Sequence, residues 1–254
     1  MYDDFSEDYD RFVNWAGRLA YEMPFLELRL AQVAPGGAVL DSACGTGMHA
    51  IALAQKGYAA AGADLSPKMV ERARENARHA GVTVRFEAAG FGELAITFGQ
   101  SRFDALLCLG NSLPHLLSEA ELSRALGDFA ACLRPGGMLF LQNRNFDAVV
   151  KRRERWMEPQ SFRDGEREWL FLRFYDYDAD GLISFNIVNL KREEGQSWTQ
   201  QVMTTRLRPL LQAETVRLLG SAGFHDIACY GDMSGAPFNP ESSSNLIVVA
   251  RLPA

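Results

Sequence analysis

One nine-residue run, Val39-Leu40-Asp41-Ser42-Ala43-Cys44-Gly45-Thr46-Gly47, limits the possible folds more than any other stretch of the chain. It has the pattern of a short apolar strand that ends at an acidic residue and passes into a glycine-rich turn. A second apolar strand is predicted over residues 59–63, and Asp64 stands at its end. Glycines in such a turn let a ligand approach the backbone more closely than a side chain would permit. The pattern therefore predicts a ligand site at the ends of two neighbouring strands.

The position of Asp41, before the glycines, indicates the class of ligand. Dinucleotide sites usually carry G-x-G-x-x-G directly after the strand, so that a helix N-terminus faces a pyrophosphate. Here a carboxylate stands where that pyrophosphate would lie. It favours a phosphate-free nucleoside that carries an ammonium or sulfonium group. A nicotinamide dehydrogenase is disfavoured, since the glycines would have to precede the acid and neither a Tyr-Lys nor a His pair is evident.

The run resembles motif I of the class I S-adenosylmethionine-dependent methyltransferases, and the resemblance extends over about residues 36–142 and more loosely through the last strands. It implies that S-adenosyl-L-methionine is the cofactor. The residues it places on the cofactor at the first turn are Asp41, Ala43, Cys44, Gly45 and Gly47. Asp64 would accept hydrogen bonds from the ribose hydroxyls, as acids at this position do in dinucleotide folds.

The resemblance also places Leu65 and Met69 against the adenine or the ribose. For Met69 a position in a helix core is an equally good interpretation. Many relatives carry an Asp after the third strand that holds the adenine amino group, whereas this chain has Gly90 there. We expect the backbone at Gly90 and Phe91 to contact the adenine edge, or Glu93 to reach back to it.

A second resemblance concerns the segment after the fourth predicted strand. Residues 108–116, Cys-Leu-Gly-Asn-Ser-Leu-Pro-His-Leu, are similar to the G-N-S-x-x-H-L segment of glycine and sarcosine N-methyltransferases, and residues 144–147, Arg-Asn-Phe-Asp, to their R-N-Y-D stretch. The resemblance implies that cofactor and acceptor meet here, at Leu109, Gly110, Asn111, His115 and Arg144. The alternatives are a turn residue for Asn111 and a helix-start residue with a backbone hydrogen bond for His115.

The beginning of the chain is expected to form a lid. Residues 6–33 have a helical pattern, and the segment around Tyr9 resembles the Y-D stretch that closes over the cofactor in this family. The resemblance implies that residues 1–33 form a helical lid, in which Tyr9 faces the methyl group, Arg18 pairs with the cofactor carboxylate and Trp15 lies beside them. A peripheral amphipathic helix is an equally good interpretation.

Strands and helices alternate in the pattern from residue 38 onward. The predicted strands are 38–41, 59–63, 83–87, 103–109 and 137–142, with helices at 47–56, 66–79 and 118–132. This alternation predicts an α/β fold with a doubly wound, Rossmann-like sheet. Residues 133–137 are expected to form a turn. A helix at 212–222 and strands at 225–231 and 244–251 would complete seven strands in a single domain, residues 1–254.

An antiparallel β insertion is predicted at residues 148–210, as a cap over the acceptor. Three strands are expected, at 168–178, 181–191 and 197–208, the first two joined by a hairpin at Asp180-Gly181. Alternation puts Arg173, Tyr175 and Tyr177 on one face, where Tyr175 and Tyr177 could bind the substrate. A solvated outer sheet face is the slightly favoured alternative.

Composition excludes several other classes. The net charge of −6 disfavours a nucleic-acid partner, and no apolar run approaches the length of a membrane span. The acidic N-terminus is not expected to be a signal peptide. The four cysteines and four histidines are dispersed, so no metal site is predicted. We expect a reduced, cytoplasmic protein, and nothing in the sequence indicates its oligomeric state.

These observations favour S-adenosylmethionine-dependent methyl transfer to a small molecule, with an amine as the preferred acceptor. A sulfonium donor is already activated, so a neutral amine acceptor needs alignment and exclusion of water more than acid–base help. The alternatives are O-methylation of a small metabolite, for which His115 would be the candidate base, and a protein that holds an adenosyl ligand without turnover.

Overall fold

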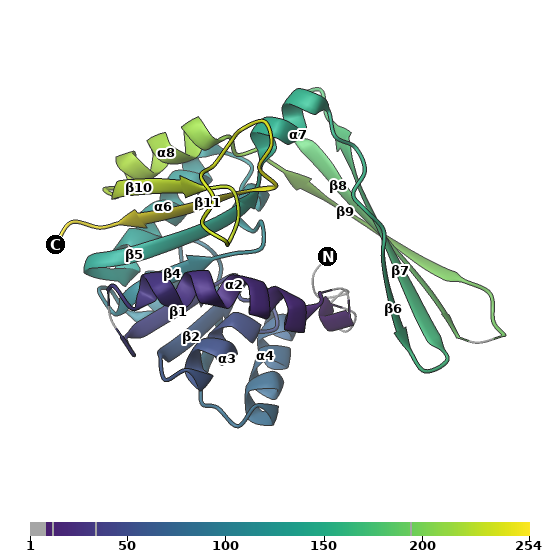
Figure 1. Ribbon diagram of the computed structural model, residues 1–254, viewed down its shortest axis with the longest axis horizontal. Coiled ribbons are helices and arrows are strands. Elements are labelled where there is room, and N and C mark those ends of the chain that lie inside the picture. The colour runs from purple at the N-terminus through teal and green to yellow at the C-terminus, as the bar shows by residue number, and fades with distance from the viewer. Residues whose placement is uncertain (1–8, 12, 34, 194) are drawn as a thin grey trace.

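The computed structural model describes residues 9–11, 13–33, 35–193 and 195–254. Its main body is a seven-stranded sheet with the strand order β10-β11-β5-β4-β1-β2-β3 (Figure 1). The strands are β1 (Ala38–Ser42), β2 (Ala59–Asp64), β3 (Arg85–Ala88), β4 (Phe103–Cys108), β5 (Leu133–Arg144), β10 (His225–Tyr230) and β11 (Asn245–Arg251). Strands β1 to β5 pair in parallel, and β11 is antiparallel to both of its neighbours. The predicted Rossmann-like sheet is confirmed.

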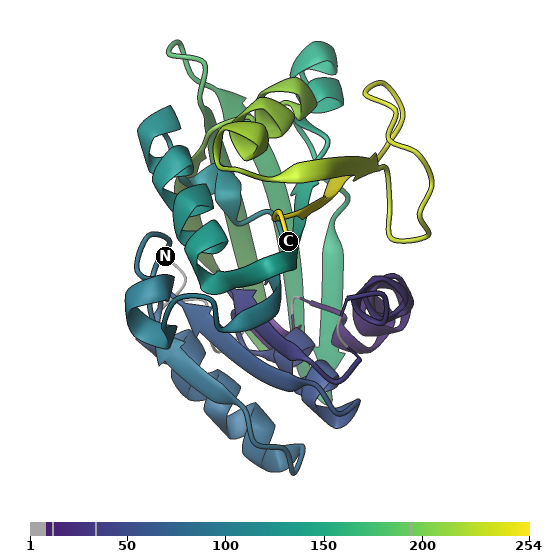
Figure 2. The same cartoon turned by 90° about the vertical axis from the view of Figure 1, so that its left-hand side faces the viewer.

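Helices cover both faces of this sheet, on opposite sides in Figure 2. One face carries α2 (Trp15–Leu30) and α3 (Met48–Gln55), with α4 (Pro67–His79) beside them, and the other carries α5 (Leu94–Phe98), α6 (Glu119–Cys132) and α8 (Gln212–Ser221). The helices begin where the sequence provides caps. Ser66 accepts a hydrogen bond from the Met69 amide, with Pro67 as the first helical residue, and Ser118 and Glu121 form a capping box.

The prediction of one helix over residues 6–33 is wrong in its extent. Residues 9–11 are helical, but α2 begins only at Trp15 and ends at Leu30. The physical reason is a cap: the Asn14 side chain accepts a hydrogen bond from the Gly17 amide, which requires Asn14 to leave the helical conformation. Residues 1–8 and 12 of the proposed lid lie outside the described residues.

The turn predicted at residues 133–137 is also wrong, because these residues belong to β5. Leu133 pairs with Phe103, and the pairing of β4 with β5 shifts in register before Ala105. Gly136 has a φ of +75° within this irregularity. A Pro-Gly-Gly sequence is typical of a turn, but at a strand end it can equally be accommodated as a bulge.

A second sheet, which we call the cap, projects beside the main body (Figure 1), and its role over the acceptor stays a prediction. It follows α7 (Phe146–Arg152) and is a four-stranded antiparallel sheet, ordered β6-β7-β8-β9. The strands are β6 (Gln160–Asp164), β7 (Arg167–Tyr177), β8 (Ile183–Glu193) and β9 (Thr199–Leu207). Three of them match the predicted strands. The fourth, β6, has five exposed residues and so no alternation by which the sequence could reveal it.

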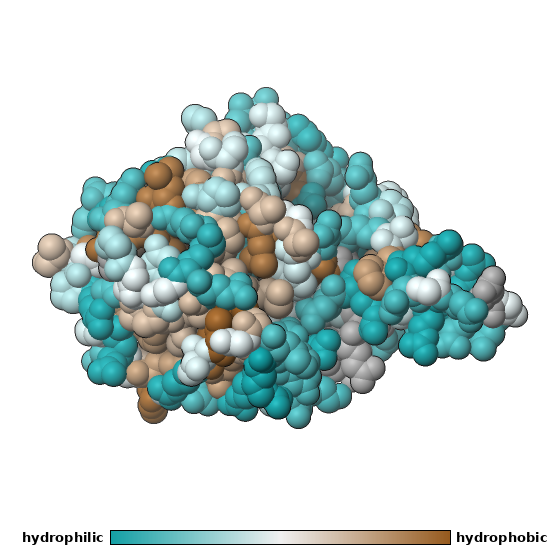
Figure 3. All heavy atoms as spheres, turned by 60° about the horizontal axis from the view of Figure 1, so that its bottom comes forward, coloured by the Kyte–Doolittle hydropathy of each residue, from teal (hydrophilic) through white to brown (hydrophobic). Residues whose placement is uncertain are grey.

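The cap sheet has one apolar face toward the body. Trp169 and Phe171 are fully buried there and pack with Tyr9, while Tyr175 packs with Phe146 of α7. The projecting end of the cap is covered mainly by hydrophilic side chains on the side that Figure 3 shows. No helix in the described part of the chain is long and apolar enough to cross a bilayer.

Candidate active site

The carboxyl ends of β1, β2 and β4 bring the predicted cofactor residues together. The turn after β1 passes through three residues with positive φ, Ala43 at +55°, Gly45 at +55° and Gly47 at +81°. A Cβ atom at Gly47 would lie 2.6 Å from the Phe86 ring and 2.8 Å from the Ala73 Cβ, so packing as well as backbone conformation requires glycine there. The turn is therefore a fixed cradle.

Asp64, at the end of β2, is oriented by the same turn. One carboxylate oxygen accepts a hydrogen bond of 2.8 Å from the Gly45 amide, and the other accepts one of 2.9 Å from the Ser66 amide. The carboxylate is thus fixed at the carboxyl end of β2 beside the glycine turn, and its role as the acceptor for the ribose hydroxyls stays a prediction.

Asp41 lies at the end of β1 in a different environment. It is 2% exposed, and burial raises its pKa to about 6 despite the positive charge of Arg18 nearby. Its Oδ2 atom has no hydrogen-bond partner among the described residues. Because a buried carboxylate is costly unless it is paired, this atom fits a ligand that brings a positive charge to the glycine turn, such as an ammonium or sulfonium group.

Arg18 is held beside this position by a buried polar network. Its Nε donates to Glu22 at 3.1 Å and its Nη2 to Gln142 at 3.3 Å, and it lies next to Gly110. Glu22 is 4% exposed, with His49 Nε2 at 2.6 Å and Gln142 Nε2 at 2.8 Å. Burial alone would raise the pKa of Glu22, but these hydrogen bonds and the Arg18 charge lower it to about 2. Arg18 therefore presents a fixed cation at the sheet edge.

Tyr9 and Asp10 lie against the glycine turn. The Tyr9 ring would lie 3.4 Å from a Cβ at Gly45, and burial raises the pKa of its phenol. Asp10 fastens this segment, because its carboxylate accepts hydrogen bonds of 2.9 Å from Trp15 and 2.6 Å from Thr46. Tyr9 and Trp15 thus lie beside the glycine turn, and their role in a lid stays a prediction.

The residues predicted at the adenine end differ in burial. Leu65 is 77% exposed, so its side chain is accessible to a ligand. Met69 is only 1% exposed, which favours the alternative of a helix-core residue. Phe91 packs edge-on against Phe129 at 5.5 Å between ring centroids. The Gly90 amide donates to Glu93.

The segment after β4 lies between the sheet and the cap. Cys108 and Leu109 are buried, and Asn111 has a φ of +68° and accepts a hydrogen bond from the Arg144 amide at 3.0 Å. Asn tolerates this left-handed conformation better than most residues, so turn chemistry accounts for part of its role. His115 Nδ1 lies 3.5 Å from the Thr205 hydroxyl of β9, and burial lowers the pKa of His115 to about 4.

Two arginines, Arg144 at the end of β5 and Arg173 on β7 of the cap, interact electrostatically. Arg144 reaches Glu154 at 3.3 Å, and its buried Nε has no hydrogen-bond partner in the described part of the chain. Arg173 stands on β7 beside Tyr175, which is 2% exposed. Burial and then the charge of Arg144 lower the pKa of Arg173, so the two guanidinium groups repel each other electrostatically.

Tyr177 lies next to this pair but has other contacts. Its hydroxyl is 2.8 Å from the carbonyl oxygens of both Val149 and Glu154, and Arg153 lies over its ring at 4.5 Å. Tyr177 therefore fastens the cap sheet to α7, and we do not retain it among the proposed substrate residues.

The sequence did not single out Glu22, His49 or Gln142, although they hold Arg18. Arg18 and Glu22 are four residues apart on one helix, a spacing that could have indicated an ion pair. Gln142 gave no such signal, since it lies 120 residues from Glu22 and meets it only after α2 packs on β5.

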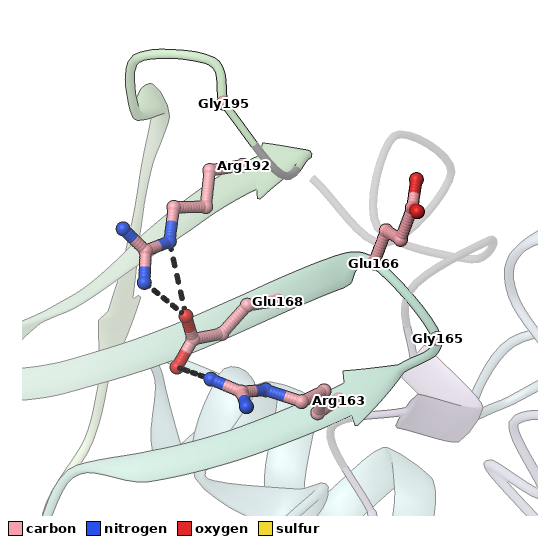
Figure 4. Close-up of a pocket in the computed structure, with 6 residues that line it drawn as sticks. All are labelled: Arg163, Gly165, Glu166, Glu168, Arg192 and Gly195. Carbon is pink, nitrogen blue, oxygen red and sulfur yellow. Dashed lines mark hydrogen bonds and ion pairs between the residues drawn. The ribbon is translucent and has the colours of Figure 1, made fainter.

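Two other hollows of the surface lie away from this site. One is at the far end of the cap, where Figure 4 shows the Glu168 carboxylate between the guanidinium groups of Arg163 and Arg192, with Glu166 pointing away. The other lies between α4 and β3 and is lined by Arg74, Arg78 and Arg85 among others. In both, the arginines are engaged with nearby carboxylates or carbonyls.

The comparisons with known proteins agree with the geometry. A methyltransferase domain model matches residues 39–137. A glycine/sarcosine N-methyltransferase of Parasynechococcus marenigrum is 37% identical over 149 residues, which cover 59% of this chain and 52% of that protein, about half its length. The glycine/sarcosine N-methyltransferase of Aphanothece halophytica is 31% identical over 234 residues, which cover 91% of this chain and 82% of that protein. A solved S-adenosylmethionine-dependent methyltransferase from Clostridium acetobutylicum is alike in fold, with a TM-score of 0.78 at 17% identity and coverage of 100% and 99% of the two chains.

Proposed function

Since the chain belongs to the class I S-adenosylmethionine-dependent methyltransferases, in the branch of the glycine/sarcosine N-methyltransferases, its cofactor is S-adenosyl-L-methionine, and we propose that its acceptor is a small amine that also carries a carboxylate. Bound S-adenosylmethionine supplies an electrophilic methyl group on a positively charged sulfur. We infer that Asp64 holds the ribose, Arg18 the carboxylate and Asp41 the positive charge of this cofactor. The acceptor then lies between the sheet edge and the cap.

The observation that carries this proposal is the pair of half-buried guanidinium groups, Arg144 and Arg173. Two like charges brought together away from water repel each other, and an anionic ligand relieves that repulsion. Guanidinium groups bind carboxylates through paired hydrogen bonds. Glu154 engages Nη2 of Arg144, whereas its Nε has no partner within the described residues. A carboxylate bound here would direct the rest of a small acceptor toward Tyr9 and the glycine turn.

An amine acceptor suits this site better than a hydroxyl acceptor. A hydroxyl needs a base to remove its proton, and the pKa of His115, lowered to about 4 by burial, makes it a weak base at neutral pH. A neutral amine already has a free lone pair. His115 is then uncharged, and it can orient the acceptor by a hydrogen bond without taking the proton, which the methylated amine releases to water. The lid and the cap exclude water from the methyl group.

The test is a matched acceptor screen that follows formation of S-adenosylhomocysteine. Glycine and sarcosine are compared with glycinamide and methylamine, which keep the amine and lack the carboxylate. We expect turnover with the amino acids and a loss of at least about tenfold in kcat/KM without the carboxylate. Equal turnover with glycine and glycinamide would refute the role of the arginine pair.

A variant separates binding of the acceptor from binding of the cofactor. Arg144→Ala should raise the KM for the acceptor by about 10- to 100-fold, the effect of losing a charge-assisted hydrogen bond. It should leave the Kd for S-adenosylhomocysteine unchanged. Arg167→Ala is the matched control, since Arg167 pairs with Glu193 at the far end of the cap. An unchanged acceptor KM in Arg144→Ala would contradict the assignment.

A further inference from the structure

The side chain of Gln142, near the end of β5, bridges two parts of the site that are far apart in sequence. Its Oε1 atom accepts a hydrogen bond of 3.3 Å from Nη2 of Arg18 and one of 3.0 Å from the Gly110 amide. Its Nε2 atom donates a hydrogen bond of 2.8 Å to Oε1 of Glu22. These partners fix the orientation of the amide, because two donors face its oxygen and a carboxylate faces its nitrogen.

The same residue holds the turn that follows β4. The Asn111 amide donates a hydrogen bond of 2.9 Å to the backbone carbonyl oxygen of Gln142. Gly110 and Asn111 have φ values of +76° and +68°, a conformation that costs free energy for a residue other than glycine. Arg18 lies against this turn, since a Cβ atom at Gly110 would lie 3.4 Å from its Nη2 atom. Gln142 therefore fixes the turn and the guanidinium group relative to each other.

The amide at position 142 holds Arg18 without adding a charge. Glu22, which is 4% exposed, already supplies a carboxylate to Arg18 at 3.1 Å. A second carboxylate at position 142 would face Glu22 across the contact of 2.8 Å, and it would repel an anionic ligand group that approaches Arg18. An uncharged acceptor supports the guanidinium group and leaves it able to bind a ligand carboxylate.

We propose that Gln142 is a positioning residue for the amino-acid end of the cofactor. It acts through Arg18, which it holds against the turn at Gly110 and Asn111 with an acceptor that carries no charge. The proposal rests on the placement of the cofactor carboxylate at Arg18 that is inferred above. It assigns to the Gln142 amide a share in the preference of the site for nucleosides that carry this carboxylate.

The test compares S-adenosylhomocysteine with 5′-methylthioadenosine, a nucleoside thioether that lacks the amino and carboxylate groups. Both Kd values are measured by calorimetry without acceptor, and their ratio is compared among variants. We expect Gln142→Glu, which is nearly isosteric, to lower the preference for S-adenosylhomocysteine by about tenfold or more. Gln142→Met, which removes the acceptor without adding a charge, should lower it by about threefold or more.

A double variant tests whether the balance of charge is the cause. Glu22→Gln/Gln142→Glu exchanges the amide and the carboxylate and can retain each of their hydrogen bonds with Arg18, Gly110 and His49. It should restore the ratio to within about threefold of the native value. A double variant as impaired as Gln142→Glu would overturn the proposal.

The ratio separates a positioning role from a merely structural one. If Gln142 only stabilised the fold, Gln142→Glu and Gln142→Met would weaken both ligands equally, and the unchanged ratio would overturn the proposal. Gln200→Glu is the matched control, since it adds the same charge at an exposed position of β9. It should leave the ratio at the native value.

Arg18→Ala distinguishes this proposal from the placement of the cofactor carboxylate on which it rests. We expect Arg18→Ala to lower the ratio at least as far as Gln142→Glu does. If Arg18→Ala lowered the ratio and the Gln142 variants did not, the role of Gln142 would be refuted and the placement of the carboxylate would stand. An unchanged ratio in Arg18→Ala would refute both.

Discussion

Three carboxylates at the site differ in their hydrogen bonds and pKa values because their surroundings differ. Asp64 accepts backbone hydrogen bonds on both oxygens. Glu22 is buried but surrounded by donors, and its pKa falls to about 2. Asp41 is equally buried with one oxygen unpartnered by any described residue, and its pKa rises to about 6. Glu22 is thus an internal support, whereas the proposed roles of Asp64 toward ribose hydroxyls and of Asp41 toward a cation follow from their different surroundings.

Asp41→Asn should separate stability from cofactor binding. A pKa raised from 3.8 to about 6 means that ionised Asp41 lowers the free energy of unfolding, and this cost develops as the pH rises through that interval. At pH 7 the Asn variant, without ligand, should be more stable by up to about 3 kcal/mol. It should bind S-adenosylmethionine about 10- to 100-fold more weakly. Urea unfolding measures the change in stability, and calorimetry measures the change in affinity for S-adenosylmethionine. If Asp41→Asn lowered both the free energy of unfolding and the affinity, the assignment of a buried, unpaired charge to Asp41 would be wrong.

Glu22→Gln should show the opposite dependence on pH. Because the pKa of Glu22 is lowered from 4.5 to about 2, its ionised form stabilises the fold above pH 4.5, and this contribution is lost as the pH falls toward 2. We expect the variant to be about 3 kcal/mol less stable at pH 7, with the difference vanishing near pH 2.

The control for Glu22 lies on the same helix. Glu27 pairs with Lys56 at 3.0 Å with both side chains substantially exposed, so Glu27→Gln should change the free energy of unfolding by less than about 1 kcal/mol. Urea unfolding from pH 2 to 7 makes the comparison. A Glu22→Gln difference that does not vary with pH would contradict the assignment of the charge.

At the scale of elements, the turn between β1 and α3 depends on Gly47. Gly47→Ala adds a Cβ that would meet Phe86 and Ala73 at under 3 Å, in a backbone conformation that already disfavours L side chains. We expect a loss of about 3 kcal/mol or more in the free energy of unfolding, with weaker cofactor binding. Gly81→Ala is matched, since Gly81 has a φ of +69° and open space around it, and it should cost about 1 kcal/mol. Equal losses would mean that backbone conformation alone requires Gly47.

Local signals explain which elements could be predicted from the sequence. The strand, glycine turn and acidic strand end that define the cradle lie within residues 38–64, so their spacing alone placed Asp41 and Asp64 together. The start of helix α2 was misplaced because a hydrophobic pattern does not reveal that Asn14 acts as its N-terminal cap. Strand β6 was missed because exposed edge strands carry no alternation.

The contacts that complete the site could not be predicted in the same way. Arg144 and Arg173 come from different sheets, and His115 meets Thr205 from 90 residues away. Their proximity follows from how the cap folds back over the sheet edge, and a single sequence does not encode such a docking angle in any local pattern. Individual residues near the acceptor were named from resemblance, whereas their partners needed the structure.

At the scale of the whole molecule, Tyr9 joins the cofactor cradle to the cap. Its ring lies over Gly45 and packs in the same cluster as Trp169 and Phe171 of β7. Arg11 lies over the Trp169 ring at 4.8 Å, which adds a second contact between the N-terminal segment and the cap. Binding of the cofactor should therefore stabilise the cap, although the cofactor cradle is built on the main sheet.

Hydrogen exchange can measure this coupling. In the native chain, S-adenosylhomocysteine should slow exchange of the backbone amides in the middle of β7 and β8 as well as at the glycine turn. Tyr9→Ala should retain slowing at the turn and lose it in the cap. Tyr21→Ala, which removes a half-exposed tyrosine from α2, should behave as the native chain. S-Adenosylhomocysteine could instead protect the cap amides of Tyr9→Ala as strongly as those of the native chain. The coupling would then pass through other contacts, and the cap would close over the acceptor without help from the N-terminal segment.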